Sequence, residues 1–406
     1  MDQLQYFEKE RLPLEGLVVL DFTRLLPGPL ATMLLGAYGA DIIKIEDVET
    51  GDPTRFVGRF IDGSGAFFRQ INRNKKSLAL NIKTEEGREI VKKLSARVDV
   101  LIEGFRPGVM KKLGLGYDEL SNINNKLIYA AITGYGYNNT LSGKAGHDIN
   151  YTGLAGLLSL CAPKGIKPET QGLQIADIGA GSFMAINAVM MALYAREKSG
   201  NGSFVDVSMT RGLLPFLALA ASALNSGEDT ARKDSGPITG AYACYNTYET
   251  KDGKYMSLGA LEPVFWQRFC ETINRPEWIE LQFDQEKRET LIKQLGIIFK
   301  EKDRKEWIER LKGLDVCCEP ILELSEAVEH PLSEETGSWL NVWHEDFKEL
   351  LVGHPFLISG SGGAELLPPP GHGEHSEEIL KSMGYSEDSI VELASKMIIK
   401  VSKDTA

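Results

Sequence analysis

The amino-terminal part of the chain alternates short apolar runs with amphipathic stretches. Residues 17–22 (LVVLDF) and 41–46 (DIIKIE) predict buried strands, because each is a short apolar run bounded by turn residues. Residues 30–40 (LATMLLGAYGA) predict a helix between them. A β–α–β order with such short connections predicts parallel strands, and therefore an α/β domain. The dinucleotide-binding string G-x-G-x-x-G does not occur here.

The same alternation continues through the first half of the sequence. Residues 84–98 open with a Thr and Glu capping signature and predict a further helix. The pattern then predicts strands at residues 99–105, 126–136 and 203–209, and one long apolar helix with a glycine-rich entry at 183–197. We therefore expect a large Rossmann-like domain with a doubly wound parallel sheet.

A change of composition divides the two halves. Residues 225–240 are rich in Gly, Ser and Asp and predict a flexible connection. After it, alternating apolar residues around the turn at 251–254 predict a β-hairpin, and helices near 266–273 and 288–311 complete a smaller α+β unit. A final helix is expected near 377–396. The expected domains are a large α/β domain at 1–225, a small α+β domain at 226–325, and a C-terminal segment at 326–406 that returns to the large domain.

No apolar stretch appears long enough to cross a bilayer, which takes roughly 18 to 20 residues. The longest apolar run, residues 212–224, predicts a buried helix, and residues 1–16 are charged and lack the apolar core of a signal peptide. We expect a cytoplasmic protein that does not associate with membranes.

Composition narrows the classes further. Hydrophobic residues make up 43% and charged residues 25% of 406, as in ordinary globular proteins of two or three domains. The net charge of −12 does not suit nucleic acid or an anionic membrane surface. The 5 cysteines are odd in number and lack metal-type spacing, so we expect reduced thiols and no metal.

Three short strings carry residues suited to catalysis. His147 lies in AGHDINYTGLAG, although a single histidine most often has a structural role. Asp177 precedes a glycine-rich helix entrance, where a carboxylate either caps the helix or faces a bound thioester whose oxyanion the backbone amides stabilise. Glu262 stands between an apolar strand and a proline, where a glutamate is often merely solvated.

Basic residues recur at turns that follow predicted strands. They include Arg24, Arg55, Arg106 and the run at 72–76. Such residues are usually solvated, but open α/β sheets bind ligands at the carboxyl ends of their strands. Coenzyme A carries a diphosphate and a 3′-phosphate, and several cationic donors would be needed to bind it.

Taken together, these strings resemble CoA-transferase family III over nearly the whole chain. The resemblance rests on residues 17–46, 72–87 (NRNKKSLALNIKTEEG), 99–120 (DVLIEGFRPGVMKKLGLGYDEL) and 368–386 (PPPGHGEHSEEILKSMGYS). It implies a large α/β domain built from the N-terminal half and the C-terminal tail, a small domain between them, and an interlocked homodimer. The substrate would be an acyl-CoA thioester, with no cofactor beyond the CoA that it carries.

Two branches of this superfamily use Asp177 differently. Transferases use the equivalent Asp as a nucleophile that receives the acyl group as a mixed anhydride. Racemases use it as an acid/base and add a GHDINY string and an EP-x-F-aromatic string, both present here at 146–151 and 262–266. The resemblance therefore favours the α-methylacyl-CoA racemase branch, with His147 and Asp177 as acid/base groups and Glu262 supporting the histidine.

The expected substrate-binding and CoA-binding residues are Arg24, Leu25, Arg55, Asn72, Arg73, Lys75, Arg106, Asp148 and Tyr151. Two segments depart from the racemase pattern. Asp47 stands where racemases commonly carry an Arg, and the segment 240–248 replaces a GGAP-like entry.

The favoured hypothesis is 1,1-proton transfer at the α-carbon of a 2-methyl-branched acyl-CoA. Removing that proton needs a base, and inversion needs an acid on the opposite face of the enolate. The alternative is a CoA-transferase that moves CoA to a free carboxylic acid through an Asp177 anhydride, which uses covalent catalysis. A third hypothesis is a catalytically silent protein that binds CoA esters.

Overall fold

The computed structural model describes residues 12–228, 231–345, 347–359 and 365–401. The chain divides into two compact units. The first combines Met1–Ala155, Gly172–Leu213 and Gly337–Ala406, and the second combines Gly156–Gln171 with Leu214–Thr336. Sequence reasoning divided the chain at 225 and 325 instead. The N-terminal segment in which no signal peptide is expected lies mostly outside the described residues.

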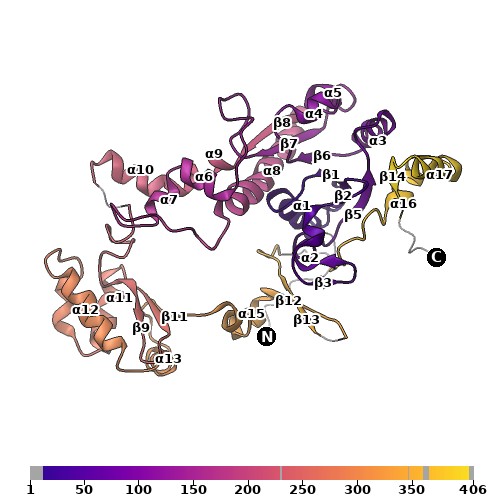
Figure 1. Cartoon of the computed structure of the whole chain (residues 1–406). Coiled ribbons are helices and arrows are strands. Elements are labelled where there is room, and N and C mark those ends of the chain that lie inside the picture. Colours follow the sequence, from indigo (N-terminus) through magenta and orange to yellow (C-terminus); the bar gives the residue numbers. More distant parts are fainter. Residues whose placement is uncertain (1–11, 229–230, 346, 360–364, 402–406) are drawn as a thin grey trace. The chain divides into compact units, whose positions relative to one another are not determined.

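The first unit is built on a seven-stranded sheet with the order β14-β5-β2-β1-β6-β7-β8 (Figure 1). The six strands from β5 to β8 are parallel, and β14 alone pairs antiparallel, with β5. The strands are β1 (Val18–Phe22), β2 (Asp41–Glu46), β5 (Lys76–Leu80), β6 (Val100–Glu103), β7 (Ile128–Thr133), β8 (Ser203–Ser208) and β14 (Ile399–Lys400). The predicted α/β class with a large parallel-sheet domain is confirmed.

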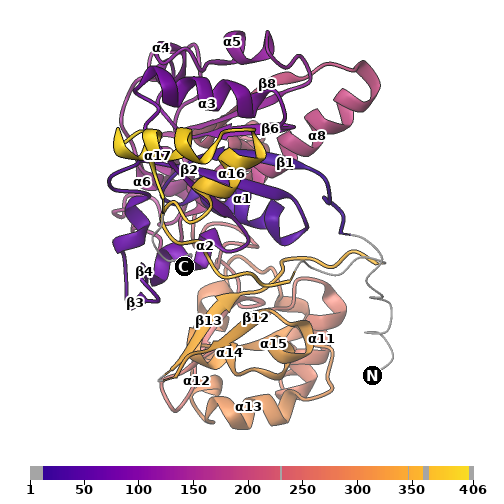
Figure 2. The same cartoon turned by 90° about the vertical axis from the view of Figure 1, so that its right-hand side faces the viewer.

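One face of this sheet is apolar. Leu20, Leu78 and Leu101 are fully buried in a core that also takes in residues of the covering helices. Figure 2 shows these helices beside the sheet. They are α3 (Glu85–Ser95), α4 (Val109–Lys112), α5 (Tyr117–Ser121), α16 (Ser376–Ser382) and α17 (Glu387–Ser395). The single C-terminal helix expected near 377–396 is therefore two helices, because Gly384 at φ +86° ends the first.

The opposite face carries buried polar residues. Asp21, Lys44 and Ser77 alternate with apolar neighbours along β1, β2 and β5, so they share a face. Helices α1 (Pro27–Ala37) and α8 (Met184–Ser199) pack against this side of the sheet. Polar side chains at this depth must find partners within the protein.

Helix α8 continues from a π-helix at Ile175–Phe183. The long apolar helix predicted at 183–197 is thus present, and the helical segment begins earlier, at Ile175. Contrary to the sequence expectation, Ile175–Ser199 is long and apolar enough to cross a membrane by length and composition. One such helix is weak evidence for a membrane span, because core helices of soluble proteins meet the same test.

The apolar run at 212–224 was wrongly predicted as one buried helix. It is divided among α9 (Met209–Gly212), a 3₁₀ turn at Leu214–Leu217 and α10 (Ala218–Asn225). Pro215 lacks the amide proton that a continuous helix needs. No residue of α10 is buried within the single chain, and Leu219 and Leu224 are 67% and 79% exposed.

The second unit contains an antiparallel sheet and an aromatic core. The sheet has the order β11-β10-β9, and β9 with β10 forms the predicted hairpin. Trp266, Phe269, Phe299 and Trp307 are fully buried in its core. Its main elements are β9 (Tyr245–Glu249), β10 (Tyr255–Gly259), β11 (Cys318–Ile321), α11 (Pro263–Thr272), α12 (Arg288–Phe299) and α13 (Arg304–Leu311).

Smaller elements complete both units. In the first unit they are β3 (Phe60–Ile61), β4 (Ser64–Gly65), β12 (Trp339–Trp343), β13 (Lys348–Val352), α2 (Ala66–Asn72), α6 (Asp148–Leu154) and a 3₁₀ turn at Pro53–Phe56. In the second unit they are α7 (Leu157–Leu160), α14 (Leu324–Val328), α15 (Pro331–Thr336) and a 3₁₀ helix at Pro276–Leu281.

Candidate active site

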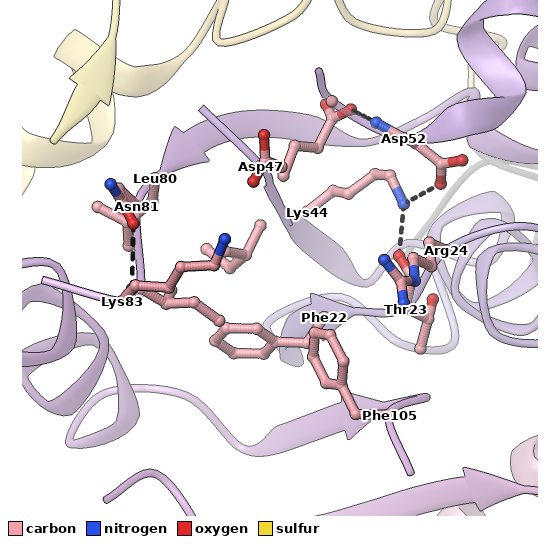
Figure 3. A pocket seen from close by; sticks show the side chains of 14 residues that line it. Phe22, Thr23, Arg24, Lys44, Asp47, Asp52, Leu80, Asn81, Lys83 and Phe105 are labelled. Atoms are coloured by element: carbon pink, nitrogen blue, oxygen red, sulfur yellow. Dashed lines mark hydrogen bonds and ion pairs between the residues drawn. The ribbon is translucent and has the colours of Figure 1, made fainter. Parts of the chain in front are cut away.

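A cavity of about 190 Å³ lies where β1, β2, β5 and β6 end (Figure 3). This is the edge at which open parallel sheets usually bind ligands. Lys83 and Asp47 point toward the open space, and Phe22 and Phe105 supply aromatic surface. The guanidinium carbon of Arg24 lies 5.6 Å from the centre of the Phe105 ring. The cavity thus combines cations with flat apolar surface.

Sequence reasoning included Arg24 among the lining residues but missed Asn81, Lys83 and Phe105. Asn81 and Lys83 follow directly after β5, and Phe105 follows β6. Phe105 is the last residue of the predicted strand 99–105, so the strand-end rule used for the basic residues could have found it. No strand was predicted at residues 76–80, so that rule could not point to Asn81 or Lys83.

Asp47 replaces an arginine of the racemase pattern with a carboxylate. Its Oδ1 accepts hydrogen bonds from the backbone amides of Glu49 and Thr50, both at 3.0 Å. Partial burial raises the pKa of Asp47, but these bonds outweigh it and hold the pKa below its usual range. The cavity therefore presents a negative charge at Asp47.

A buried polar network supports the turn that carries Arg24 and Leu25. Lys44 is fully buried, and its Nζ lies 2.8 Å from the Thr23 carbonyl oxygen and 2.9 Å from Asp52 Oδ2 (Figure 3). Leu25 has a left-handed backbone (φ +68°), which is strained for a residue with a side chain. The turn is held in this conformation by the polar groups beneath it.

Lys75 and Asn72 belong to the same network. Lys75 Nζ donates to the Pro29 carbonyl and to Asn72 Oδ1, both at 2.8 Å, and lies 3.2 Å from Asp21 Oδ2. Burial lowers the pKa of Lys75 to about 7, although Asp21 opposes this shift. Lys75 and Asn72, which were both predicted to bind CoA, are buried and hydrogen-bonded to other groups of the protein, and neither lines the cavity.

Arg55 and Arg73 are also engaged inside the protein. Arg55 forms a two-pronged ion pair with Glu46 at 2.8 and 2.6 Å, and its guanidinium carbon lies 3.8 Å from the centre of the Phe68 ring. Arg73 donates to the Val352 carbonyl at 2.7 Å. These contacts leave both side chains in structural positions, and their assignment to CoA phosphates stays a prediction.

A second group of polar residues lies where α6 and the π-helix begin. His147 is the N-cap of α6, and Asp148 is its first residue. Asp148 Oδ1 accepts hydrogen bonds from the amides of Ala176 at 2.6 Å and Asp177 at 3.0 Å. The structure therefore brings the GHDINY string and the Asp177 string together.

The surroundings of Asp177 suit proton transfer. Burial, followed by the like charge of Asp148, raises the pKa of Asp177 to about 6, and His147 opposes the shift. A carboxyl group with a pKa near neutrality can both accept and return a proton. His147 is exposed in the single chain, whereas Asp177 is partly buried.

Glycine in the π-helix allows a close approach to the start of α1. A Cβ atom at Gly181 would lie 2.9 Å from Pro27 Cβ, closer than real Cβ atoms approach. Ser182 Oγ donates to the Pro27 carbonyl at 2.6 Å. The helix that carries Asp177 is thereby held against the turn that carries Arg24. π-Helical turns occur frequently at functional sites.

Tyr151 and Arg106 complete this group. Tyr151 Oη donates to the Gly146 carbonyl at 2.6 Å, and its ring packs edge-on against Tyr135. Burial, followed by the charge of Asp177, raises the pKa of Tyr151 to about 12, and Arg106 opposes that shift. Arg106 and Asp177 are therefore both close enough to act electrostatically on Tyr151.

Glu262 belongs to the second unit. It is the exposed N-cap of α11, and no hydrogen bond from its side chain caps that helix. Its support of His147 stays a prediction. Among the described residues, no group of three His, Cys, Asp or Glu side chains could hold a metal ion.

Comparison with known proteins identifies the superfamily. The model of CoA-transferase family III matches residues 14–376. Human α-methylacyl-CoA racemase is 30% identical over 393 residues, covering 97% of this chain and 99% of that protein. Mouse succinyl-CoA:glutarate CoA-transferase is 33% identical over 397 residues, covering 96% and 90%.

A solved structure gives the same result. The crystal structure of a CAIB/BAIF family protein from Brucella suis superimposes with a TM-score of 0.81 at 28% identity, covering 92% of this chain and 100% of that chain. The chain belongs to CoA-transferase family III. It is an enzyme of this superfamily, in which both racemases and transferases are similar to it at about 30% identity.

Proposed function

We propose that the enzyme interconverts the 2R and 2S forms of 2-methyl-branched acyl-CoA thioesters. The observation that carries this proposal is the pairing of His147 and Asp177 at two adjoining helix starts. Racemisation requires one group to remove the α-proton and a second to return a proton to the other face of the enolate. Asp177, with a pKa of about 6, exchanges a proton near neutral pH without a large energetic cost.

The proposed racemisation divides two proton transfers between His147 and Asp177. One of the two groups accepts the α-proton, and the electron pair of the broken C–H bond moves into the thioester carbonyl to give an enolate. The other group then donates its proton to the opposite face of the α-carbon. The amides of Ala176 and Asp177, at the start of the glycine-rich helix, already donate to Asp148 Oδ1 and are therefore not available to stabilise the negative oxygen. Asp148 supports Asp177 by holding its backbone amide.

We assign the nucleotide part of CoA to the cavity at the strand ends. Phe22 and Phe105 offer surface to the adenine ring, and Arg24 and Lys83 offer positive charge to the phosphates. In this proposal Lys83 takes the part that the sequence assigned to Arg55 and Lys75. CoA enters as part of the substrate, and we propose no further cofactor.

A specific observation supports transferase activity as the second candidate. The segment containing Asp47 and Arg55 departs from the racemase pattern, and a transferase is 33% identical to the chain. In that reaction the Asp177 carboxylate attacks the thioester carbonyl and CoA leaves as the thiolate. The acceptor carboxylate then attacks the aspartyl carbonyl of the anhydride and releases the donor acid. The CoA thiolate finally attacks the carbonyl of the new acyl group, which forms the new thioester and frees the Asp177 carboxylate.

Deuterium incorporation separates the two reactions. The purified enzyme is incubated in deuterium oxide with 2-methylacyl-CoA, with and without succinate or formate, and the products are followed by mass spectrometry. We expect α-deuterium without added carboxylate, lost in both His147→Ala and Asp177→Ala. Acyl exchange that requires the carboxylate and survives His147→Ala would overturn the racemase proposal. CoA-ester binding without either reaction would indicate a silent binding protein.

We also propose that the working enzyme is a cytoplasmic homodimer. Helices α8 and α10 expose large apolar side chains in the single chain, including Met191 at 72%, Tyr194 at 65% and Leu224 at 79%. Apolar surface concentrated on helices in this way usually marks an interface. A second copy of the chain is the occupant that the family resemblance implies.

A further inference from the structure

Glu103 is a buried carboxyl group that the proposed chemistry does not use. It is the last residue of β6 and lies in the middle of the sheet, paired in register with Phe22 of β1 and Ala131 of β7. Its side chain is 1% exposed, and burial raises its pKa to about 7. Within the described part of the chain, no ion pair includes Glu103. A carboxyl group in this position is costly unless its hydrogen bonds compensate.

Its first hydrogen bond fixes the loop after β6. Glu103 Oε2 accepts the backbone amide of Phe105 at 2.6 Å. Phe105 lines the cavity and lies under the Arg24 guanidinium, and the next residue, Arg106, acts electrostatically on Tyr151. The bond therefore sets the direction of a loop that has one residue in the cavity and the next close enough to Tyr151 to act on it electrostatically.

Its second hydrogen bond fixes the loop after β7. Tyr137 Oη donates to Glu103 Oε1 at 3.1 Å. Two residues earlier, the Tyr135 ring lies 5.2 Å from the Tyr151 ring, edge-on. Gly134 also lies against Tyr151, because a Cβ there would come within 2.6 Å of its hydroxyl oxygen. The loop at 134–137 thus forms part of the support of Tyr151.

We propose that Glu103 is a positioning residue that joins the loops at 104–108 and 134–137 and so sets the distance between the cavity and the Asp177 group. One carboxyl group accepts one bond from each loop. Losing either bond frees a loop that touches the site, although Glu103 itself is too deeply buried to contact substrate. The inference rests on the proposed function, since it assigns CoA to the cavity and acyl chemistry to Asp177.

The test uses Glu103→Leu, Glu103→Gln, Tyr137→Phe and the double variant with Leu and Phe. Two measurements are made on the full-length enzyme: the Kd for free CoA by calorimetry, and the hydrogen exchange of the amides at 104–108 and 134–137 without ligand. Tyr248→Phe is the matched control. It removes another buried phenol, one that lies in the second unit and whose hydroxyl donates to the Ala243 carbonyl at 2.7 Å.

We expect the loss of the shared carboxyl group to weaken CoA binding about tenfold in Glu103→Leu and about threefold in Tyr137→Phe, as hydrogen-bond losses of this kind do. The double variant should match Glu103→Leu within about twofold, because coupled residues are not additive. Glu103→Gln keeps an acceptor for Phe105 and should stay near wild type. The effect should fall on KM more than on kcat.

Hydrogen exchange gives the result that separates this inference from the proposed function. Tyr137→Phe should speed the hydrogen exchange of the amides at 104–108, in the other loop, whereas Tyr248→Phe should not. If the wild-type enzyme fails to bind CoA, the proposed function fails while the exchange measurement still tests the coupling. Unchanged exchange at 104–108 in Tyr137→Phe, or additive effects in the double variant, would overturn the role of Glu103.

Discussion

At the scale of single residues, the candidate site depends on carboxyl groups whose surroundings differ. Backbone amides hold the pKa of Asp47 below its usual range. Burial and the charge of Asp148 raise the pKa of Asp177, and burial raises the pKa of Glu103. Residue type therefore says little about protonation here. The pH dependence of the enzyme reports which of these groups limits each step.

Asp177 should control the acid side of the pH–activity profile. With a pKa of about 6, it loses its ionised form as the pH falls through 6, and kcat/KM should fall with it. Asp148→Asn removes the neighbouring like charge, which lowers the pKa of Asp177, and moves the acid limb to lower pH. Rates of deuterium incorporation between pH 5 and 9 would check this, with Asn keeping an oxygen for the two backbone amides. An acid limb that does not move would assign it to another group.

Glu103 should make stability fall as the pH rises. Its folded pKa of about 7 exceeds its ordinary value of 4.5, so the folded form binds the extra proton in this interval. The free energy of unfolding therefore decreases between about pH 4.5 and 7 and stays lower above it. As the pH rises between these limits, the unfolding free energy of Glu103→Gln should increase relative to that of wild type by on the order of 3 kcal/mol, measured by urea unfolding. Tyr248→Phe, which removes a buried phenol of the second unit, should differ from wild type by an unfolding free energy that does not change over the same range.

At the scale of elements, sequence patterns predicted five of the seven strands of the main sheet and missed β5 and β14. The strands β1, β2, β6 and β7 are short apolar runs buried on both faces, and such runs are distinctive in sequence. The apolar run at 212–224 gave the wrong result, since hydrophobicity alone does not tell whether a helix is covered by its own chain. Likewise, nothing in the residue types distinguishes the π-helical start of Ile175–Phe183 from an α-helix.

The π-helix depends on a glycine at its contact with α1. Gly181→Ala places a methyl group 2.9 Å from Pro27 Cβ, so the two helices must move apart. We expect a loss of about 1 to 3 kcal/mol in unfolding free energy, typical of overpacking, together with lower activity because Asp177 shifts. Thermal unfolding and deuterium incorporation measure the two effects. Gly153→Ala is a suitable control, because a Cβ at that glycine meets nothing within 4 Å. Equal behaviour of the two variants would contradict this account.

The candidate site was predicted in part. Arg24 lines the cavity at the strand ends, and Asp148 and Tyr151 lie near Asp177. The roles of these residues and of His147 in binding and catalysis stay predictions. The basic residues of the segments 53–56 and 72–76 were harder to judge, because their partners come from distant parts of the chain. Pro370 and Val352, for example, supply backbone acceptors to Arg55 and Arg73. Such contacts depend on tertiary packing and leave no local signal.

At the scale of the whole molecule, the single chain leaves apolar helices uncovered, and dimerisation should follow. Leu224→Asp, at a position 79% exposed in α10, should weaken self-association if that helix lies in the interface. Light scattering after size-exclusion chromatography gives the mass of the assembly. Val391→Asp, at a residue of α17 that is 68% exposed, is a matched control outside this patch and should leave the mass unchanged. A monomeric wild-type enzyme would contradict the homodimer proposal.

The last strand of the main sheet is made by residues near the end of the chain. β14 pairs with β5, while β5 itself is formed by residues 76–80. On the ribosome, the edge of β5 must therefore stay unpaired until residues 399–400 have emerged. An unpaired strand edge is prone to join other chains. Truncation before Ile399 should consequently raise aggregation during synthesis more than it lowers the activity of molecules that fold.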